Sequence, residues 1–384
     1  MNSKAAVGVV RRERLRPDSL LLLAKWIVNS RYCPNPRGEI IGCSEMSLEQ
    51  KNQAVRRERR TTPAAESRMT VLSRTAIVAV LLAALVLLPV FSAADASEVC
   101  QPLYAVATSS APVLNTPDFR SVFGGKDGKT LATDPCGQIR ELEFIALPGT
   151  SFRIKAVLSG PESTVYSVVT DDYPYPAATG YYIDGRFVTV SANPSPPRSR
   201  ILPDRETILA RLASAKGAAY VWGGNRREGV TDMLTCFPPP PEKPLDILTR
   251  DRWTLRGLDC SGLLYEATDG YTPRNTSTLV EYGDPVSIAG LDGEGIANRV
   301  RPLDLIVWKG HVMIVYDRER IIESRLDCEG KKGGVAFRGL RETLRELLGT
   351  RSPLDSWTDG KVNGAKWFVI RRWYPAEGAA PAPQ

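Results

Sequence analysis

Residues 258–269 (LDCSGLLYEATD) are the stretch that decides the fold. Leu263, Leu264 and Ala267 recur at helical spacing, so the stretch predicts a loop that runs into a helix. Cys260 lies at the start of that helix, where the positive end of the helix dipole favours a thiolate. Because the thiolate is the reactive form of cysteine, this position suits a nucleophile. The alternative is a buried structural cysteine, which is the more common role of a lone cysteine.

His311 is the only histidine of the chain, and it lies at the start of a predicted strand (VMIVY, residues 312–316). A cysteine nucleophile commonly needs an adjacent base, and the sequence offers no other imidazole. The next predicted strand ends at Glu323, so an antiparallel neighbour would carry this carboxylate back beside His311. There it would hold the ring and stabilise the imidazolium, as the third member of a triad. The alternatives are a structural imidazole for His311 and a polar strand-end residue for Glu323.

The residues around these three predict an α+β arrangement, in which a helix is followed by antiparallel strands. Asp204 can cap a helix that ends at Gly217, with apolar residues at 208, 209 and 212 on one face. Residues 225–257 are irregular, with consecutive prolines at 238–241, and are typical of an insertion. Further strands are predicted over residues 304–308, 312–316, 321–323 and 366–371.

The sequence before this region predicts only short strands. Between residues 100 and 193, Gly, Pro and Asp residues separate groups of apolar and aromatic residues, which indicates a small all-β barrel or sandwich. Residues 191–200 (SANPSPPRSR) are rich in proline and have no apolar period, so we expect a semi-rigid linker. The apolar groups are Phe144 and Ile145, Phe152 and Ile154, residues 165–169, residues 181–183, and Phe187 and Val188.

The net charge of +7 comes from the first 68 residues. They hold 14 Lys/Arg and 7 Asp/Glu, whereas the rest of the chain holds 36 of each. The rest is therefore neutral overall, which argues against a nucleic-acid partner. We expect residues 1–68 to be a basic leader that is absent from the mature protein, with translation starting at Met69.

Residues 75–90 (TAIVAVLLAALVLLPV) form one uncharged apolar run that follows Arg74 and precedes small residues at 92–96. As a helix the run would span about 24 Å, which is short for a hydrocarbon core of about 30 Å. A basic start, a short apolar core and a small-residue end are typical of a secretory signal peptide, here residues 69–96. An uncleaved membrane anchor is the alternative, so membrane contact is expected only through this segment. The protein is accordingly expected to be exported, to the periplasm, the cell envelope or the medium.

Five cysteines follow the apolar run: Cys100, Cys136, Cys236, Cys260 and Cys328. An odd number in an oxidising compartment leaves at least one thiol unpaired or in an intermolecular bridge. Pairing Cys100 with Cys136 and Cys236 with Cys328 would leave Cys260 free, although sequence alone does not fix the connectivity. One histidine and no closely spaced cysteines argue against a zinc site, and no metal or other cofactor is expected.

Five short blocks occur along the chain: YVWGG at 220–224, DCSG at 259–262, TPRNT at 272–276, RPLDL at 301–305 and GHV at 310–312. In this order they resemble the blocks of the NlpC family of bacterial cell-wall cysteine peptidases. Members of this family are papain-like enzymes with a circularly rearranged order of elements. The resemblance covers about residues 204–374. The chain departs from the family in the long stretch between the first two blocks and at Leu303, where glycine is usual.

The resemblance implies roles for the residues in these blocks. Cys260 would be the nucleophile, His311 the base and Glu323 the third polar residue, a position that varies in the family among His, Asn, Gln and acids. The other residues would stabilise the oxyanion or hold the substrate: Tyr220 near the nucleophile, Asp259 and Ser261 on the substrate peptide, Arg274 in the pocket wall, and Thr276 as a further member of the site.

By the resemblance, the substrate is a peptidoglycan stem peptide. The bond cleaved would join the side-chain carboxyl of D-glutamate to a diamino acid such as diaminopimelate, by way of a thioester on Cys260. One alternative is an amidase or acyltransferase of the same papain-like architecture that acts on another amide or on a lipid. Another is a wall-binding protein whose catalytic half is vestigial.

The sequence GYYID at 180–184, with RFV at 186–188, resembles the closing strand of a bacterial SH3-like domain. Such domains accompany NlpC-type enzymes and bind wall peptides or border the cleft. The expected fold is therefore α+β, a papain-like catalytic domain preceded by a small SH3-like barrel. The predicted segments are a leader at 1–68, a signal peptide at 69–96, an SH3-like domain at 97–193, a linker at 194–203, a peptidase domain at 204–377 and a disordered tail at 378–384.

Overall fold

The computed structural model describes residues 33–34, 40–41, 103–125, 130–159, 163–241, 245–328, 333–357 and 366–375. Two short strands early in the chain, β1 (Cys33–Pro34) and β2 (Ile40–Ile41), pair antiparallel. The described residues from 103 onward belong to one compact unit. The predicted signal peptide, Cys100, the predicted tail and most of the predicted leader lie outside the described residues.

Residues 103–191, which we call the β part, form an antiparallel sheet. Its strands follow the order β9-β3-β6-β7-β8-β4-β5. Their bounds are β3 (Leu103–Ala107), β4 (Ala111–Leu114), β5 (Leu142–Ala146), β6 (Ser151–Ser159), β7 (Thr164–Val169), β8 (Tyr181–Asp184) and β9 (Val188–Ser191). The predicted apolar groups lie in these strands, except that Phe187 ends a short 3-10 helix, η2 (Gly185–Phe187).

Alternation along β6 shows why these short segments are strands. Phe152 and Ile154 are buried, whereas Arg153 and Lys155 between and after them are exposed. Successive side chains of a strand point to opposite faces, so one face of β6 joins the core and the other meets solvent. The short strand predicted at these residues is thus confirmed.

The expected closed SH3-like barrel is not confirmed. Among the described residues no pairing joins the edge strands β5 and β9, so the sheet stays open. A side chain occupies the edge of β5 instead: Asn225 accepts from the Ile145 N–H and donates to the Ile145 carbonyl, both at 2.9 Å. Because this buried amide satisfies both backbone groups, β5 needs no further strand at that point.

The segment predicted as an insertion, residues 225–257, packs into the core of the β part. Its Phe237 stacks on Phe119 and Phe123, with ring centroids 5.8 and 5.3 Å apart. Trp253 is fully buried in the same cluster and donates its indole N–H to the Phe237 carbonyl at 2.8 Å. The helices involved are α4 (Phe119–Val122), α6 (Met233–Cys236) and α7 (Ile247–Trp253).

Residues 201–375, without 225–257, build a second sheet with helices, which we call the α+β part. The strands run in the order β12-β18-β13-β14-β15-β16, antiparallel, and β17 pairs parallel with β18. They are β12 (Asp284–Pro285), β13 (Leu305–Trp308), β14 (His311–Val315), β15 (Arg320–Arg325), β16 (Gly334–Gly339), β17 (Ser352–Pro353) and β18 (Trp367–Arg372). The helices are α5 (Arg205–Ser214), α8 (Cys260–Ala267), α9 (Thr276–Leu279), α10 (Gly293–Ala297) and α11 (Leu340–Leu348). A separate strand pair, β10 (Asn225–Arg226) with β11 (Gly257–Leu258), brackets residues 225–257.

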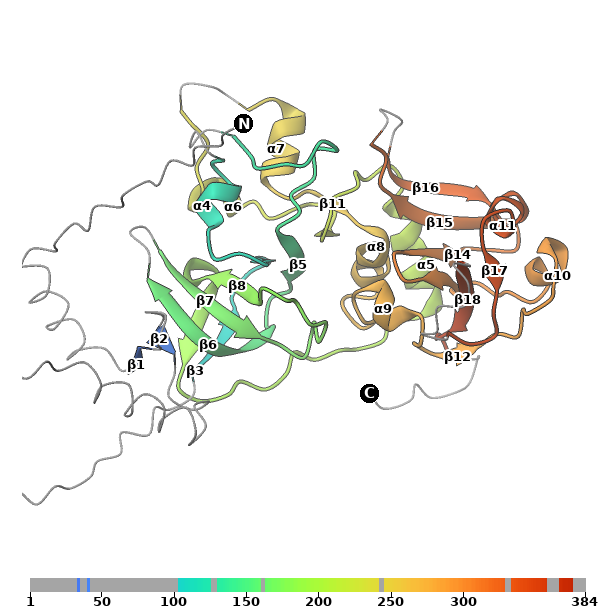
Figure 1. The fold of residues 1–384 in the computed structure, drawn as a ribbon, viewed down its shortest axis with the longest axis horizontal. Coiled ribbons are helices and arrows are strands. Elements are labelled where there is room, and N and C mark those ends of the chain that lie inside the picture. Colours follow the sequence, from blue (N-terminus) through green and yellow to red (C-terminus); the bar gives the residue numbers. More distant parts are fainter. Residues whose placement is uncertain are drawn as a thin grey trace, which may run out of the picture. The chain divides into compact units, whose positions relative to one another are not determined.

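Helices cover both faces of this sheet (Figure 1). Val312 and Ile314 of β14 pack with α5 and α8, whereas Met313 and Val315 pack with α10 and α11. A strand buried on both faces has no side that faces solvent, which explains the continuous apolar run in β14. The predicted mixed α+β fold is confirmed, as is the cap of α5, where Asp204 Oδ1 accepts from the Thr207 N–H at 2.7 Å.

A disulfide joins Cys136 of the β part to Cys328, which follows β15, with the two Cα atoms 4.7 Å apart. The predicted pairings of Cys136 with Cys100 and of Cys328 with Cys236 are therefore wrong. Cys236 is unpaired, as is Cys260. A disulfide requires two close Cα atoms, and nothing in the local sequence reveals that the loop carrying Cys136 meets the end of β15.

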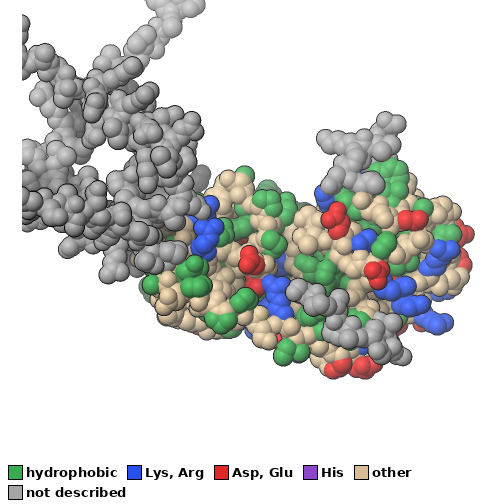
Figure 2. Space-filling view, turned by 90° about the horizontal axis from the view of Figure 1, so that it is seen from below, with side chains coloured by type: hydrophobic (Ala, Val, Ile, Leu, Met, Phe, Trp, Pro, Cys, Tyr) green, Lys and Arg blue, Asp and Glu red, His purple; other side chains and the backbone are tan. Residues whose placement is uncertain are grey.

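The described surface carries both signs of charge. Basic and acidic side chains are interspersed over the face shown in Figure 2. No helix formed by the described residues is long and apolar enough to span a membrane.

Candidate active site

The candidate active site is built at the N-terminus of α8. Cys260 is the first helical residue, and Asp259 caps the helix, with Oδ1 accepting from the Gly262 N–H at 2.6 Å. Among the described residues no backbone carbonyl accepts from the Cys260 N–H, which is one of the donors that a helix leaves open at its start. Cys260 therefore lies at the positive end of the helix dipole, beside an N–H suited to stabilising an oxyanion.

Gly262 allows α8 to lie directly against the loop at 220–224. A Cβ atom at position 262 would lie 2.0 Å from the Gly224 carbonyl oxygen, a distance that no side chain tolerates. The Asp259 N–H donates to that same oxygen at 2.8 Å. The glycine of the DCSG block is thus required by packing. This close contact fixes the position of the N-terminus of α8, and with it Cys260, relative to the loop at 220–224.

His311 opens β14 after a two-residue turn from β13, in which Gly310 has a φ of 120°. The Gly310 N–H donates to Thr276 Oγ1 at 2.9 Å, so the predicted site residue Thr276 holds this turn. His311 Nε2 lies 2.6 Å from Glu323 Oε2. The Cys260 side chain lies close enough to act on the charge of His311, and Nδ1 is the ring nitrogen that Glu323 leaves free.

Strand register places Glu323 beside His311. Ile314 of β14 lies opposite Ile322 of β15, so Glu323 and His311 share the face that α11 covers and lie diagonally across the two strands. The antiparallel return predicted from the sequence is confirmed by this register. The role of Glu323 in catalysis stays a prediction.

The His311–Glu323 pair is held in its ionised form. Burial opposes the charge on His311, but hydrogen bonds to Cys260 and Glu323 outweigh it and raise the pKa from 6.5 to about 9. Burial also opposes the charge on Glu323, but the contacts with His311 and the nearby Arg338 prevail and lower the pKa of that carboxyl. An imidazolium between a cysteine and a carboxylate is the arrangement that cysteine nucleophiles use.

Two further residues, not singled out from the sequence, complete this side of the site. Arg338 of β16 donates to Glu323 Oε1 at 3.3 Å, so both oxygens of the buried carboxylate have partners. The ring of Trp308 lies 5.3 Å from the His311 ring. Trp308 ends a predicted strand three positions before His311, and this closeness in sequence could have identified it. Arg338 lies in a strand that was not predicted.

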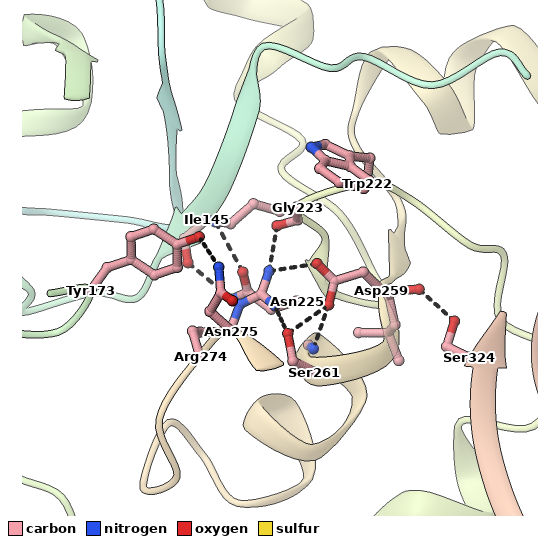
Figure 3. Close-up of polar contacts among 12 residues, drawn as sticks. Ile145, Tyr173, Trp222, Gly223, Asn225, Asp259, Ser261, Arg274, Asn275 and Ser324 are labelled. Atoms are coloured by element: carbon pink, nitrogen blue, oxygen red, sulfur yellow. Dashed lines mark hydrogen bonds and ion pairs between the residues drawn. The ribbon is translucent and has the colours of Figure 1, made fainter. Parts of the chain in front are cut away.

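Asp259 and Ser261, which flank Cys260 in the sequence, form one buried network with Arg274, which Figure 3 shows in close-up. Arg274 binds both Asp259 oxygens, at 2.7 and 2.9 Å, and donates to Ser261 Oγ at 2.5 Å. It also donates to the Gly223 carbonyl at 2.9 Å. The structure therefore brings these predicted site residues together. Their contact with a substrate stays a prediction.

Tyr220 lies close enough to Cys260 and Asp259 for their charges to act on its hydroxyl. Burial first, and then these two charges, raise the pKa of Tyr220 well above its usual range. The phenol consequently remains protonated and able to donate a hydrogen bond, as an oxyanion-binding group must. From the β part, Tyr173 accepts a hydrogen bond from Asn275 at 3.2 Å, so this part borders the same region.

No family model matches the chain, and no curated protein matches it in sequence. Among solved structures it is similar to an NlpC/P60 family protein from Bacillus cereus ATCC 10987, with 14% identity and a TM-score of 0.27, over 73% of this chain and 66% of that one. It is also similar to NlpC2 from Trichomonas vaginalis, with 12% identity and a TM-score of 0.26, over 72% of this chain and 74% of that one. For NlpC1 from the same organism the values are 11% and 0.26, over 72% and 70%. The chain thus spans 66% of the length of the Bacillus cereus protein.

Proposed function

We propose that the protein is a papain-like cysteine endopeptidase of the NlpC type that hydrolyses peptidoglycan stem peptides at the D-glutamyl–diamino acid bond. The observation that carries the proposal is the chain of contacts from Cys260 through His311 to Glu323, at a helix N-terminus. The five ordered sequence blocks supply the substrate class.

The first half of the reaction forms a thioester. The Cys260 thiolate attacks the amide carbonyl carbon, and the carbonyl oxygen becomes an oxyanion that the Cys260 N–H and the Tyr220 hydroxyl stabilise. The C–N bond then breaks as the His311 imidazolium transfers its proton to the leaving nitrogen. The products of this half are the free amine, neutral His311 and the acyl-enzyme.

The second half releases the acid. Neutral His311 takes a proton from water, and the hydroxide attacks the thioester carbonyl carbon. The C–S bond breaks, which restores the thiolate and the His311 imidazolium. Glu323 keeps the ring oriented in both halves and stabilises its positive charge.

We also propose that the enzyme acts outside the cytoplasm, in the periplasm, in the cell envelope or as a secreted protein. The apolar run at 75–90 supports this as a signal peptide or anchor. The Cys136–Cys328 disulfide adds independent support, because such bonds persist mainly in oxidising compartments.

Product identification tests the proposal. Full-length protein is incubated with purified muropeptides, and the products are identified by mass spectrometry. We expect cleavage between D-Glu and the diamino acid, which gives one fragment that ends in L-Ala-D-Glu, still joined to the amino sugar, and a free peptide that begins with the diamino acid. Release of any other pair of products would point to a different amide, and intact muropeptides would contradict the proposed function.

Matched variants separate chemistry from folding. Cys260→Ala and His311→Ala should abolish release, whereas Cys236→Ala, at the other unpaired cysteine, should preserve it. Circular dichroism melting checks that all three variants remain folded. Undiminished turnover in Cys260→Ala would rule out the mechanism.

A further inference from the structure

A cavity adjoins the candidate active site on the α11 side of the sheet. It has a volume of about 400 Å³ and is lined by the His311–Glu323 pair, by Trp308, and by Thr343 and Arg351 from α11 and the segment after it. His311 is the residue that this cavity shares with the candidate active site.

The position of His311 says which half of a substrate would occupy this cavity. His311 protonates the leaving nitrogen in the proposed reaction, so the leaving residue must lie next to the His311 ring. Cys260, Asp259 and Tyr220, which would hold the acyl half, do not line the cavity. The cavity thus lies where the released residue would extend.

A buried hydroxyl in the cavity wall lacks a partner. Thr343 is 2% exposed, and its Oγ1 has no hydrogen-bond partner among the described residues. Buried side-chain hydroxyls are hydrogen-bonded in nearly all folded proteins. The lone Thr343 hydroxyl is thus a donor that a polar group of a ligand would satisfy.

The cavity also has a surplus of positive charge. Arg338 is neutralised by Glu323 at 3.3 Å and by Glu346 at 2.5 Å. Arg351, by contrast, stacks on the Trp308 ring at 4.2 Å and donates only to a backbone carbonyl, that of Trp367, at 3.4 Å. No carboxylate among the described residues pairs with Arg351, so its guanidinium is available to an anion.

We propose that this cavity is the subsite for the residue released as the amine and that it binds a side-chain carboxylate of that residue through Arg351 and the Thr343 hydroxyl. This inference rests on the proposed function and adds a selectivity to it. A diamino acid whose side chain ends in a carboxylate as well as an amine, such as diaminopimelate, is preferred over lysine, which has the amine alone. Guanidinium groups bind carboxylates with well-defined geometry, which suits this discrimination.

Two peptides that differ only at the third residue test the subsite: L-Ala-γ-D-Glu-meso-diaminopimelate and L-Ala-γ-D-Glu-L-lysine. With the full-length protein we expect kcat/KM to be at least about tenfold higher for the diaminopimelate peptide, the effect of one hydrogen bond to a charged group. Arg351→Gln should lower kcat/KM for that peptide by about 10- to 100-fold and bring the ratio close to one. Arg351→Lys should retain part of the preference.

Further variants keep the test decisive. Thr343→Val preserves shape, so it should reduce the ratio by a few fold if the hydroxyl binds substrate and leave it unchanged if it does not. Arg341→Gln on the same helix, where Arg341 pairs with Glu294 at 2.9 Å, is the matched control and should keep the wild-type ratio.

The outcomes distinguish the two proposals. A wild-type ratio near one, or an equal loss on both peptides in Arg351→Gln, overturns the subsite and leaves the proposed function standing. A wild-type protein that cleaves neither peptide overturns both.

Discussion

Glu323 occupies one ring nitrogen of His311, and this contact leaves the other nitrogen for the proposed proton transfer. Glu323 holds Nε2 at 2.6 Å, so in the proposed reaction Nδ1 is the nitrogen that exchanges protons with Cys260 and the substrate. The carboxylate also favours the charged ring, which must be present to protonate a leaving amine. In this account the pH range of activity is set by contacts to His311 rather than by its ordinary pKa.

Replacing Glu323 by Gln should shift the alkaline limb of the pH–rate profile. With a His311 pKa of about 9, the imidazolium is present below that pH, and the rate should fall as pH rises through it. Glutamine keeps a hydrogen bond but removes the charge, so burial lowers the pKa of His311 and the limb moves to lower pH. We expect kcat/KM at neutral pH to fall by about tenfold or more.

The control for this prediction is Glu346→Gln, a partner of Arg338 that does not contact His311. It should leave the limb in place. An unshifted limb in Glu323→Gln would mean that Glu323 does not act on the histidine charge.

At the same scale, sequence reasoning reached the residues whose signal is local. Cys260 was predictable from its place before a helical period, and Glu323 from the antiparallel return of the strand that follows His311. Asn225 was not, because its amide satisfies the backbone of Ile145, 80 positions away along the chain. The orphaned hydroxyl of Thr343 was not predictable either, because its burial depends on how α11 packs.

Among the elements, the turn that leads into β13 holds a leucine in a backbone conformation that favours glycine. Leu303 stands where glycine is usual in the family that the chain resembles, and it adopts a φ of 73°. The turn is held by its N–H, which donates to the Val315 carbonyl at 2.7 Å, and its side chain is fully buried. A left-handed conformation costs a non-glycine residue about 1–2 kcal/mol.

Leu303→Gly should nevertheless destabilise the protein. It relieves the strained backbone, but removing a buried leucine side chain typically costs about 2–5 kcal/mol, and glycine adds backbone entropy to the unfolded chain. The packing loss exceeds the relief, so we expect a net loss of about 1–4 kcal/mol in the free energy of unfolding. Urea denaturation measures this loss. An increase in stability would show that strain outweighs packing at this turn.

Elements were predicted where their pattern was long or clear. Strands β13, β14, β15 and β18 and helices α5 and α8 appear within a few residues of the predicted bounds. Helix α11 was missed although Leu340, Leu344 and Leu347 are buried at helical spacing, so its pattern was present. The two-residue strands β10 and β11 depend on pairing across residues 225–257 and have no local pattern.

For the molecule as a whole, long-range links join the β part to residues 225–257 and to the α+β part. The Asn225 amide binds the edge of β5, and the Cys136–Cys328 disulfide spans a sequence separation of 192. The Asn225 link helps explain why residues 225–257, predicted as an insertion, are packed into the fold. The disulfide explains why cysteine spacing misled, because the bridge follows the docking of the two parts.

The double variant Cys136→Ser/Cys328→Ser tests this link. Removing a native disulfide typically costs about 2–5 kcal/mol in the free energy of unfolding, and we expect a loss of that order with activity retained under native conditions. Cys236→Ser is the matched control and should be nearly neutral. Non-reducing peptide mapping should recover a Cys136–Cys328 peptide, and a Cys236–Cys328 peptide would contradict the structure.

The central claim is that Cys260 carries the acyl group during turnover, and trapping that intermediate tests it most directly. Full-length protein is mixed with the diaminopimelate stem peptide, quenched in acid within the first turnover, digested and analysed by mass spectrometry. We predict an L-Ala-D-Glu acyl group on the peptide that contains Cys260, none on the Cys236 peptide, and none in His311→Ala. Hydrolysis that proceeds in Cys260→Ser with no acyl adduct on Cys260 in the wild type would contradict the account.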